Sequence, residues 1–158
     1  MKVDVFIIGG GITGAGIARD LAMRGVKVFL VEKNDFASGT TGTCMGLLHG
    51  GARYLLYEPE ITKVSCEEAG YIRNIANHLT FRVPFLTPVF KGQKHNLNLY
   101  DAFFTIYDSY QHLKEGKKHH RLSAEETLKI EPSLNPELVG AVGYDEWGVD
   151  VFRLTLLN

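Results

Sequence analysis

A glycine-rich turn near the start of the chain narrows the possible folds more than any other segment. Its six residues, Gly9-Gly10-Gly11-Ile12-Thr13-Gly14, follow the apolar run Val3–Ile8. A helix-like run comes next and ends at Arg24-Gly25, and a second apolar run from Val26 reaches Glu32. The order strand, glycine turn, helix, strand and acid is that of a βαβ unit that binds a nucleotide pyrophosphate and ribose. The sequence therefore predicts an α/β fold with a Rossmann-like beginning.

Each glycine of the turn has a physical role in that prediction. Gly9 permits the tight turn, Gly11 lets the backbone approach phosphate, and Gly14 lets helix and strand lie close together. The N–H groups at the start of the helix then face an anion, and Glu32 faces the ribose hydroxyls. A Walker P-loop is excluded, because it needs Lys and then Ser or Thr where this chain has Ala15-Gly16. A turn that only packs the helix on the strand is the alternative.

Composition and charge limit the class of protein. The 158 residues are 45% hydrophobic and 22% charged, as in an ordinary globular domain. A formal net charge of -1 provides no general attraction for nucleic acid, so we expect no such partner. We recognise neither a signal peptide nor an apolar run of the ~18 residues that a spanning helix needs. Cys44 and Cys66 lack metal-ligand spacing, as do the histidines, so we expect reduced thiols, no metal and a cytoplasmic location.

Hydropathy and turn residues predict further elements along the chain. These are a helix from Pro59 to about His78, an edge strand or bulge at 81–90, a helix at 99–113, a short helix opened by the capping box Ser123 and Glu126, strands at 138–144 and 147–150, and a helix at 151–157 capped by Asp150. The aromatic face of the helix at 99–113, with basic residues at 117–121, permits two interpretations. It is either a core face followed by a solvated loop, or a peripheral contact with the inner face of the cell membrane.

Three segments carry a resemblance to a known family. They are DVFIIGGGITGAGIARDLAMRGVKVFLVEKNDFASGTTG, GLLHGGARYLL and LSAEETLKIEPSLNPELVGAVGYDEWGVDVFRLTLLN, and they cover most of the chain. Together they resemble the N-terminal part of FAD-dependent glycerol-3-phosphate dehydrogenases, of the DAAO-like superfamily of FAD oxidoreductases. Where many members have a serine-rich loop with a basic residue, this chain has Thr41-Gly42-Thr43-Cys44-Met45-Gly46. That segment looks more like the anaerobic type, and somewhat like flavoenzymes that oxidise 2-hydroxy acids.

The resemblance implies an incomplete Rossmann-like FAD-binding domain with part of a second, substrate-binding α+β region. Residues 1–80 would be the N-terminal part of the FAD-binding domain, and 81–150 part of the substrate or cap region. Residues 151–158 would begin a truncated helix. We expect these residues alone neither to turn over substrate nor to hold FAD tightly.

The resemblance also implies the residues that bind the cofactor. Gly9, Gly11, Thr13 and Gly14 would hold the FAD pyrophosphate, and Glu32 the adenosine ribose. The full implied set is Gly9, Gly11, Thr13, Gly14, Glu32, Lys33, Ser38, Gly39, Thr40, Thr41, Leu48, His49, Gly50 and Gly51. The hydroxyls of Ser38–Thr41 can satisfy phosphate oxygens without bulk, although a loop also uses such residues for its own bends.

The segment from His49 to Arg53 would lie on the flavin and substrate side. Glycines at 50 and 51 let a backbone lie flat against a planar ring, and His49 is either a flavin neighbour or a structural hydrogen-bonding residue. Arg53 matches a substrate-phosphate arginine of the family, and its planar fork suits two phosphate oxygens; a surface salt bridge is the alternative. No residue is assigned as the catalytic acid or base.

The reaction that the resemblance implies is oxidation of sn-glycerol 3-phosphate to dihydroxyacetone phosphate. A hydride would pass from the substrate to flavin N5, and the electrons would pass on to a quinone, a partner subunit or oxygen. Three alternatives stay open. They are a related FAD-dependent oxidoreductase of 2-hydroxy acids or amino acids, a nicotinamide-dependent dehydrogenase, and a nucleotide-binding module without catalysis.

Overall fold

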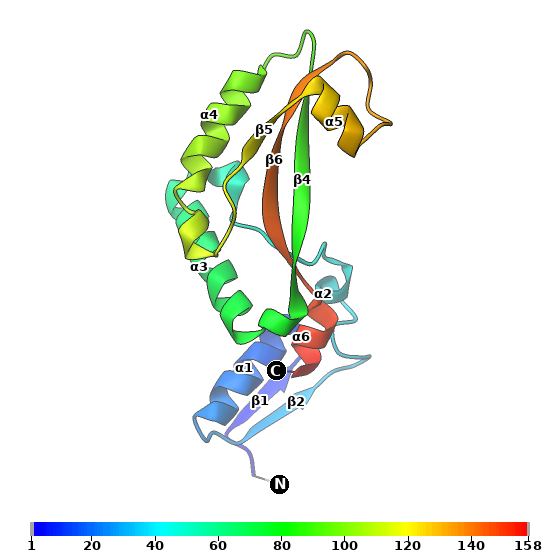
Figure 1. Cartoon of the computed structure of the whole chain (residues 1–158). Coiled ribbons are helices and arrows are strands. Elements are labelled where there is room, and N and C mark those ends of the chain that lie inside the picture. The colour runs from blue at the N-terminus through cyan, green and yellow to red at the C-terminus, as the bar shows by residue number, and fades with distance from the viewer. Residues whose placement is uncertain (1, 158) are drawn as a thin grey trace. The chain divides into compact units, whose positions relative to one another are not determined.

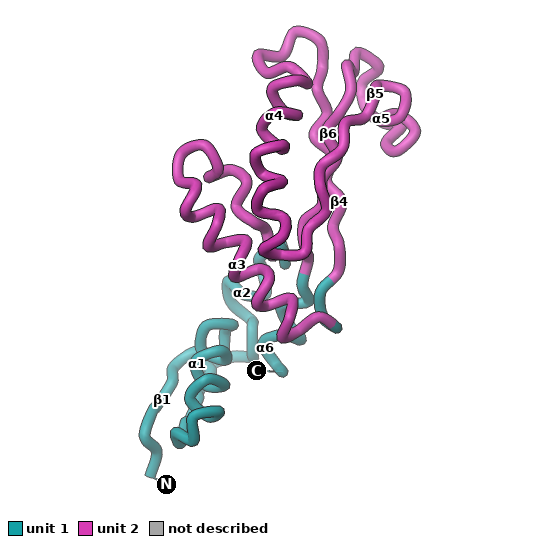
Figure 2. Tube along the Cα trace, turned by 60° about the vertical axis from the view of Figure 1, so that its left-hand side comes forward, with its two compact units in different colours: residues 1–47, 78–80, 149–158 teal, residues 48–77, 81–148 magenta. Residues whose placement is uncertain are grey.

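The computed structural model describes residues 2–157, which form two compact units (Figure 2). The first unit contains the described residues up to Leu47, together with His78–Thr80 and the residues from Val149 onward. The second contains Leu48–Asn77 and Phe81–Gly148. The boundaries of these compact units differ from those of the functional regions 1–80, 81–150 and 151–158 that the resemblance implies. The functional regions stay a proposal.

The first unit is built on a βαβ arrangement (Figure 1). Strand β1 (Val5–Ile8) pairs in parallel with β2 (Val28–Val31), and α1 (Ile12–Met23) connects them. The register pairs Val5 with Val28 and Ile8 with Val31. Helix α1 contacts both β2 and α6 (Val151–Leu157), while the short α2 (Thr40–Thr43) also contacts α6. The predicted α/β class and the strand, turn, helix and strand order are confirmed.

The second unit contains helices beside an extended sheet. Its elements are β3 (Leu47–Leu48, at the boundary), η1 (Ala52–Tyr54), α3 (Pro59–Ile75), β4 (Thr80–Phe90), α4 (Leu97–Asp108), η3 (Gln111–Leu113), β5 (His120–Ser123), α5 (Ala124–Ile130) and β6 (Leu138–Val149); η2 (Asn77–Leu79) leads into β4. The strand order is β3-β6-β4. Strand β5 pairs antiparallel with β6 (Figure 1). Strand β4 therefore lies at the end of this order. Its two prolines are tolerated there, because the missing N–H groups do not interrupt the hydrogen bonds of a central strand.

The hydrophobic core of the second unit joins both helices to the sheet. Its buried residues come from the end of η1, from α3 and α4, and from β4 and β6: Leu55 directly after η1, then Cys66, Val89, Leu97, Phe104, Tyr107 and Val142. The ring of Phe104 lies 4.4 Å from that of Tyr144, measured between centroids. The core thus fixes α3 and α4 against β4 and β6, and the segment from 48 to 54 enters the same packing.

Several element predictions are confirmed and two need correction. The helix from Pro59, the capping box of Ser123 and Glu126, and the cap of the last helix by Asp150 are as predicted. The predicted helix at 99–113 is wrong in its second half, because α4 ends at Asp108 and Gln111–Leu113 form a 3-10 turn.

The predicted pair of strands at 138–144 and 147–150 is one continuous strand, β6. Two acidic residues, Asp145 and Glu146, lie between the predicted strands. In the structure Asp145 lies 3.6 Å from Arg82 (Oδ2 to Nη1), and Glu146 is buried and paired with Lys114. Charge pairing lets both acids remain within a strand.

Candidate functional site

Backbone hydrogen bonds attach the glycine turn to the end of β2 and the loop after it. The Gly9 N–H donates to the Val31 carbonyl (2.8 Å), and the Ala37 N–H donates to the Gly10 carbonyl (2.9 Å). The Gly10 N–H donates to Oε2 of Glu32 (2.7 Å). The turn and the acid, 22 residues apart in sequence, are therefore in direct contact.

Gly14 is required by a close approach between the start of α1 and the turn. A Cβ at this position would lie 2.0 Å from the carbonyl oxygen of Gly9. Gly9 itself has φ of 112°, a conformation that side chains disfavour. These contacts support the packing role that the sequence predicts for Gly14 and the turn role predicted for Gly9.

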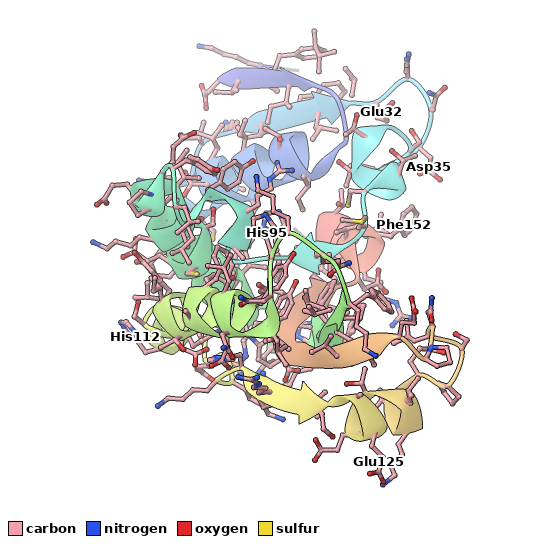
Figure 3. All side chains as sticks on the ribbon, turned by 90° about the horizontal axis from the view of Figure 1, so that it is seen from above. Glu32, Asp35, His95, His112, Glu125 and Phe152 are labelled. Carbon is pink, nitrogen blue, oxygen red and sulfur yellow. The ribbon has the colours of Figure 1, made fainter. Side chains whose placement is uncertain are left out.

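Glu32 lies directly after β2, with its carboxylate toward the turn (Figure 3). One oxygen accepts from Gly10 and the other accepts from the Asn34 N–H (3.0 Å). The hydrogen bond from Gly10, followed by that from Asn34, holds the pKa of Glu32 below its usual value. The ionised carboxylate retains lone pairs that can accept ribose hydroxyls.

Two hollows of about 280 and 390 Å³ meet at the start of α1, and both are lined by Gly11 and Thr41. Many of the cofactor-binding residues predicted from the sequence line these hollows. The first hollow is lined by Gly9, Gly11, Thr13, Gly14 and Thr41. The second is lined by Gly11, Glu32, Lys33, Ser38, Gly39, Thr40 and Thr41. The Thr41 hydroxyl also accepts from the Ile12 N–H (3.1 Å). Ser38–Thr41 thus line a hollow beside the helix start, as a loop along a phosphate chain would.

Sequence reasoning missed five residues that also line these hollows, namely Ile7, Ile8, Ile12 and Ile17 in the first and Asn34 in the second. Ile17 follows Gly14 by three residues, and so shares the helix face that looks toward the turn. Helical spacing could have indicated it. Asn34 could have been found from its place two residues after the acid.

The remaining predicted residues, Leu48, His49, Gly50, Gly51 and Arg53, belong to the second unit. The Gly51 N–H donates to Nδ1 of His49 (3.1 Å). An Nδ1 that accepts a hydrogen bond carries no proton, so this geometry assigns the proton of a neutral ring to Nε2. His49 is exposed, and its Nε2–H can donate to a ligand.

Arg53 is exposed and lies over the ring of its neighbour Tyr54. Its guanidinium carbon is 4.7 Å from the ring centroid, and Nη2 donates to the Tyr54 hydroxyl. Within residues 2–157 it pairs with no carboxylate, so the surface salt bridge considered from the sequence is not formed there. The stacked guanidinium retains N–H groups for an anionic ligand.

The described part of the chain contains neither a metal cluster nor a membrane-spanning helix. No group of three or more His, Cys, Asp or Glu side chains in residues 2–157 is arranged to hold a metal ion. None of the helices described there has the length and apolar character needed to cross a membrane.

The comparison with protein families decides the class. The family model described as "FAD dependent oxidoreductase" matches residues 4–158. The chain belongs to this family. The predicted cofactor, FAD, is confirmed, and a nicotinamide-dependent dehydrogenase is set aside. The glycine turn, Glu32 and the two hollows have the donors and acceptors that the adenosine diphosphate half of FAD needs.

Known relatives confirm the predicted resemblance. One subunit of the anaerobic glycerol-3-phosphate dehydrogenase of Escherichia coli (strain K12) is 39% identical over 155 residues, which is 98% of this chain and 27% of the relative. The aerobic glycerol-3-phosphate dehydrogenase of Bacillus subtilis (strain 168) is 39% identical over 155 residues, 97% of this chain and 28% of the relative. The two relatives have the same percentage identity to the chain, which spans little more than a quarter of their length.

A solved structure agrees with these relatives. The glycerol-3-phosphate dehydrogenase of Bacillus halodurans complexed with FAD has a TM-score of 0.66 and 33% identity, covering 98% of this chain and 23% of that one. The fold of the FAD-binding family is therefore present in this chain in part.

Proposed function

We propose that this protein, with FAD bound, oxidises sn-glycerol 3-phosphate to dihydroxyacetone phosphate. The observation that carries the proposal is the 39% identity to glycerol-3-phosphate dehydrogenases over 98% of the chain. Similarity of this extent includes the glycine turn, the hydroxyl-rich loop and the segment from His49 to Arg53. The alternatives are a related FAD-dependent oxidoreductase of 2-hydroxy acids or amino acids, and a nucleotide-binding module without catalysis.

The residues of the first unit would hold the adenosine diphosphate half of the cofactor. The start of α1 directs N–H groups and its positive end toward a pyrophosphate, and Gly11 has no side chain between backbone and ligand. Glu32 would accept the ribose hydroxyls. Lys33 and the hydroxyls of Ser38–Thr41 would complete the lining.

The residues of the second unit would act on the flavin and the substrate. FAD, when bound, would supply the redox chemistry for removal of a hydride from C2 of the substrate, and a base would take the proton of the substrate hydroxyl. Leu48 and the backbone of Gly50 and Gly51 would lie along the flavin ring, with the His49 Nε2–H as a donor. Arg53 would bind the substrate phosphate with its guanidinium oriented by Tyr54. The electron acceptor would be a quinone, a partner subunit or oxygen.

We place the protein in the cytoplasm, with a peripheral contact at the inner face of the cell membrane. The contact is supported by an apolar hollow of about 410 Å³ lined by Leu56, Tyr57, His95, Leu99, Tyr100, Ala102, Phe103 and Ile106. Leu99 and Ile106 are each 52% exposed, on α4. Co-sedimentation of the full-length protein with phosphatidylglycerol vesicles tests this, and loss of binding in Leu99→Ser with Ile106→Ser is expected. Equal sedimentation of variant and wild type contradicts it.

Anaerobic titration of the full-length flavoprotein tests the proposed reaction. Addition of sn-glycerol 3-phosphate should bleach the visible flavin absorbance, because two electrons enter the cofactor per substrate oxidised. Lactate, glycine and proline should leave the absorbance unchanged at the same concentrations. Bleaching by one of these instead indicates a related oxidoreductase, and a flavin that none of them reduces indicates a binding module.

A further inference from the structure

A buried polar cluster in the second unit has no place in the function described so far. Lys114 is 1% exposed, Glu146 4% and Tyr107 0%. The ammonium of Lys114 donates to Glu146 Oε2 and to the Tyr107 hydroxyl (2.9 Å), and Tyr107 donates to Glu146 Oε1 (2.6 Å). Burial, and then the Glu146 carboxylate, raise the pKa of Tyr107 above its usual range, so this hydroxyl keeps its proton and donates. The three side chains therefore form a closed triangle.

The triangle is in direct contact with the backbone of Gly50. The Gly50 N–H donates to Glu146 Oε2 (3.2 Å), across 96 residues of sequence. A Cβ at Gly50 would lie 2.2 Å from the Tyr107 hydroxyl, 2.5 Å from Cys66 Sγ and 2.9 Å from Lys114 Nζ. Glycine at this position is thus required by the triangle itself, in addition to any cofactor.

Helix α3 binds the other side of the same segment. The Cys66 thiol donates to the Gly50 carbonyl (3.4 Å), and the Thr62 hydroxyl donates to the Gly51 carbonyl (3.0 Å). Burial raises the pKa of Cys66 to about 11, which keeps the thiol protonated as this donation requires. Three backbone groups of Gly50 and Gly51 are therefore bound by buried side chains, while His49 and Arg53 on either side are exposed.

A buried ion pair is weak evidence for stability, because desolvation of two charges offsets their attraction. What this pair does provide is a fixed acceptor aimed at one backbone N–H. We propose that Glu146, oriented by Lys114 and Tyr107, is a positioning residue that holds Gly50 and so sets the conformation of the 49–53 segment for catalysis. This inference rests on the proposed function only in placing that segment at the flavin and substrate.

Two double variants of the full-length flavoprotein separate this role from a merely structural one. The variant Lys114→Met with Glu146→Gln removes both charges. The side-chain amide at position 146 keeps an oxygen that can accept from the Gly50 N–H, and its NH2 group can donate to the Tyr107 hydroxyl. Lys114→Met with Glu146→Leu removes both charges and the acceptor. The two variants differ in the hydrogen bonds of residue 146 to Gly50 and to Tyr107, and neither variant leaves an unpaired buried charge.

Hydrogen exchange and flavin properties are the readouts. In the Leu variant we expect peptides covering 49–53 to exchange at least about tenfold faster than in the Gln variant. We also expect a shifted flavin absorption spectrum and reduction potential, and a kcat at least about tenfold lower, while the Gln variant stays within about threefold of wild type. Equal exchange in the two variants overturns the proposal, as does unequal exchange with identical flavin potential and kcat.

Milder variants keep the proposal testable if the double variants do not fold. Thr62→Val removes the hydroxyl that donates to the Gly51 carbonyl, and Thr127→Val removes an equally buried hydroxyl that donates to the Ser123 carbonyl (2.7 Å), away from the segment. The first should shift the flavin spectrum and the second should not. Identical flavin absorption spectra in Thr62→Val and Thr127→Val contradict the proposal. Failure of the proposed function is seen separately, as wild-type flavin that sn-glycerol 3-phosphate does not bleach.

Discussion

At the residue scale, the two cysteines differ in the surroundings that govern thiol reactivity. Cys44 is exposed, whereas Cys66 is 0% exposed and burial raises its pKa from the ordinary 9.0 to about 11. Because the folded state favours the protonated thiol, this preference stabilises the fold below pH 9.0 and is lost as the pH rises toward 11. The thiolate is the nucleophile, so Cys66 becomes reactive only as the pH rises toward 11.

We therefore predict that iodoacetamide at pH 8 alkylates Cys44 and leaves Cys66 unmodified. Peptide mass spectrometry of the native protein checks this, with guanidinium-denatured protein as the control in which both react. Modification of native Cys66 at the rate of Cys44 would show that the contact with Gly50 is not maintained in solution.

Arg53 is the single residue whose proposed role depends most on charge geometry. Arg53→Ala should leave FAD content unchanged and lower kcat/KM for sn-glycerol 3-phosphate by ~2 kcal/mol or more of transition-state stabilisation. Arg53→Lys should recover part of it, since an ammonium keeps the charge but loses the planar fork. Steady-state kinetics of the full-length enzyme measure both. An unchanged kcat/KM in Arg53→Ala refutes the assignment.

At the scale of elements, the junction between β1 and α1 is the least tolerant of added volume. Gly14→Ala would place its Cβ 2.0 Å from a backbone oxygen that cannot move as a side chain does. We predict a loss of about 1–3 kcal/mol in the free energy of unfolding, as in other overpacked sites. Denaturant unfolding measures it, with Gly16→Ala as the control, because a Cβ at Gly16 meets no atom within 4 Å. Equal stability of the two variants contradicts this account of the turn.

The elements that could be predicted are those written in local sequence. The capping box joins Ser123 to Glu126, only three positions further on, and the glycine turn specifies its own strand and helix neighbours. Strand β6 could not be predicted as one strand, because the acids Asp145 and Glu146 interrupt its apolar sequence, and Lys114, which pairs with Glu146, is 32 residues away. The contact of Glu146 with Gly50 is equally invisible, since no periodicity links residues that only tertiary packing brings together.

At the scale of the whole molecule, apolar side chains remain on the surface of the small parallel sheet. Ile8 is 84% exposed, Phe6 54% and Phe29 41%, and the two rings stack at 5.7 Å between centroids. Parallel sheets are normally covered on both faces. We predict that residues 1–158 expressed alone self-associate and bind the dye ANS. Light scattering after size exclusion checks this, and a monodisperse monomer without dye binding contradicts it.

The affinity of the full-length apoprotein for FAD tests the central claim most directly, measured by quenching of flavin fluorescence. Gly11 lines both hollows, and a Cβ there would lie 3.0 Å from the Thr41 hydroxyl oxygen, a side-chain atom that can shift slightly. Gly11→Ala should therefore fold yet raise the Kd for FAD at least about tenfold, or ~1.4 kcal/mol. Gly16→Ala should bind as wild type does. A wild-type Kd in Gly11→Ala would contradict the placement of the pyrophosphate at this turn.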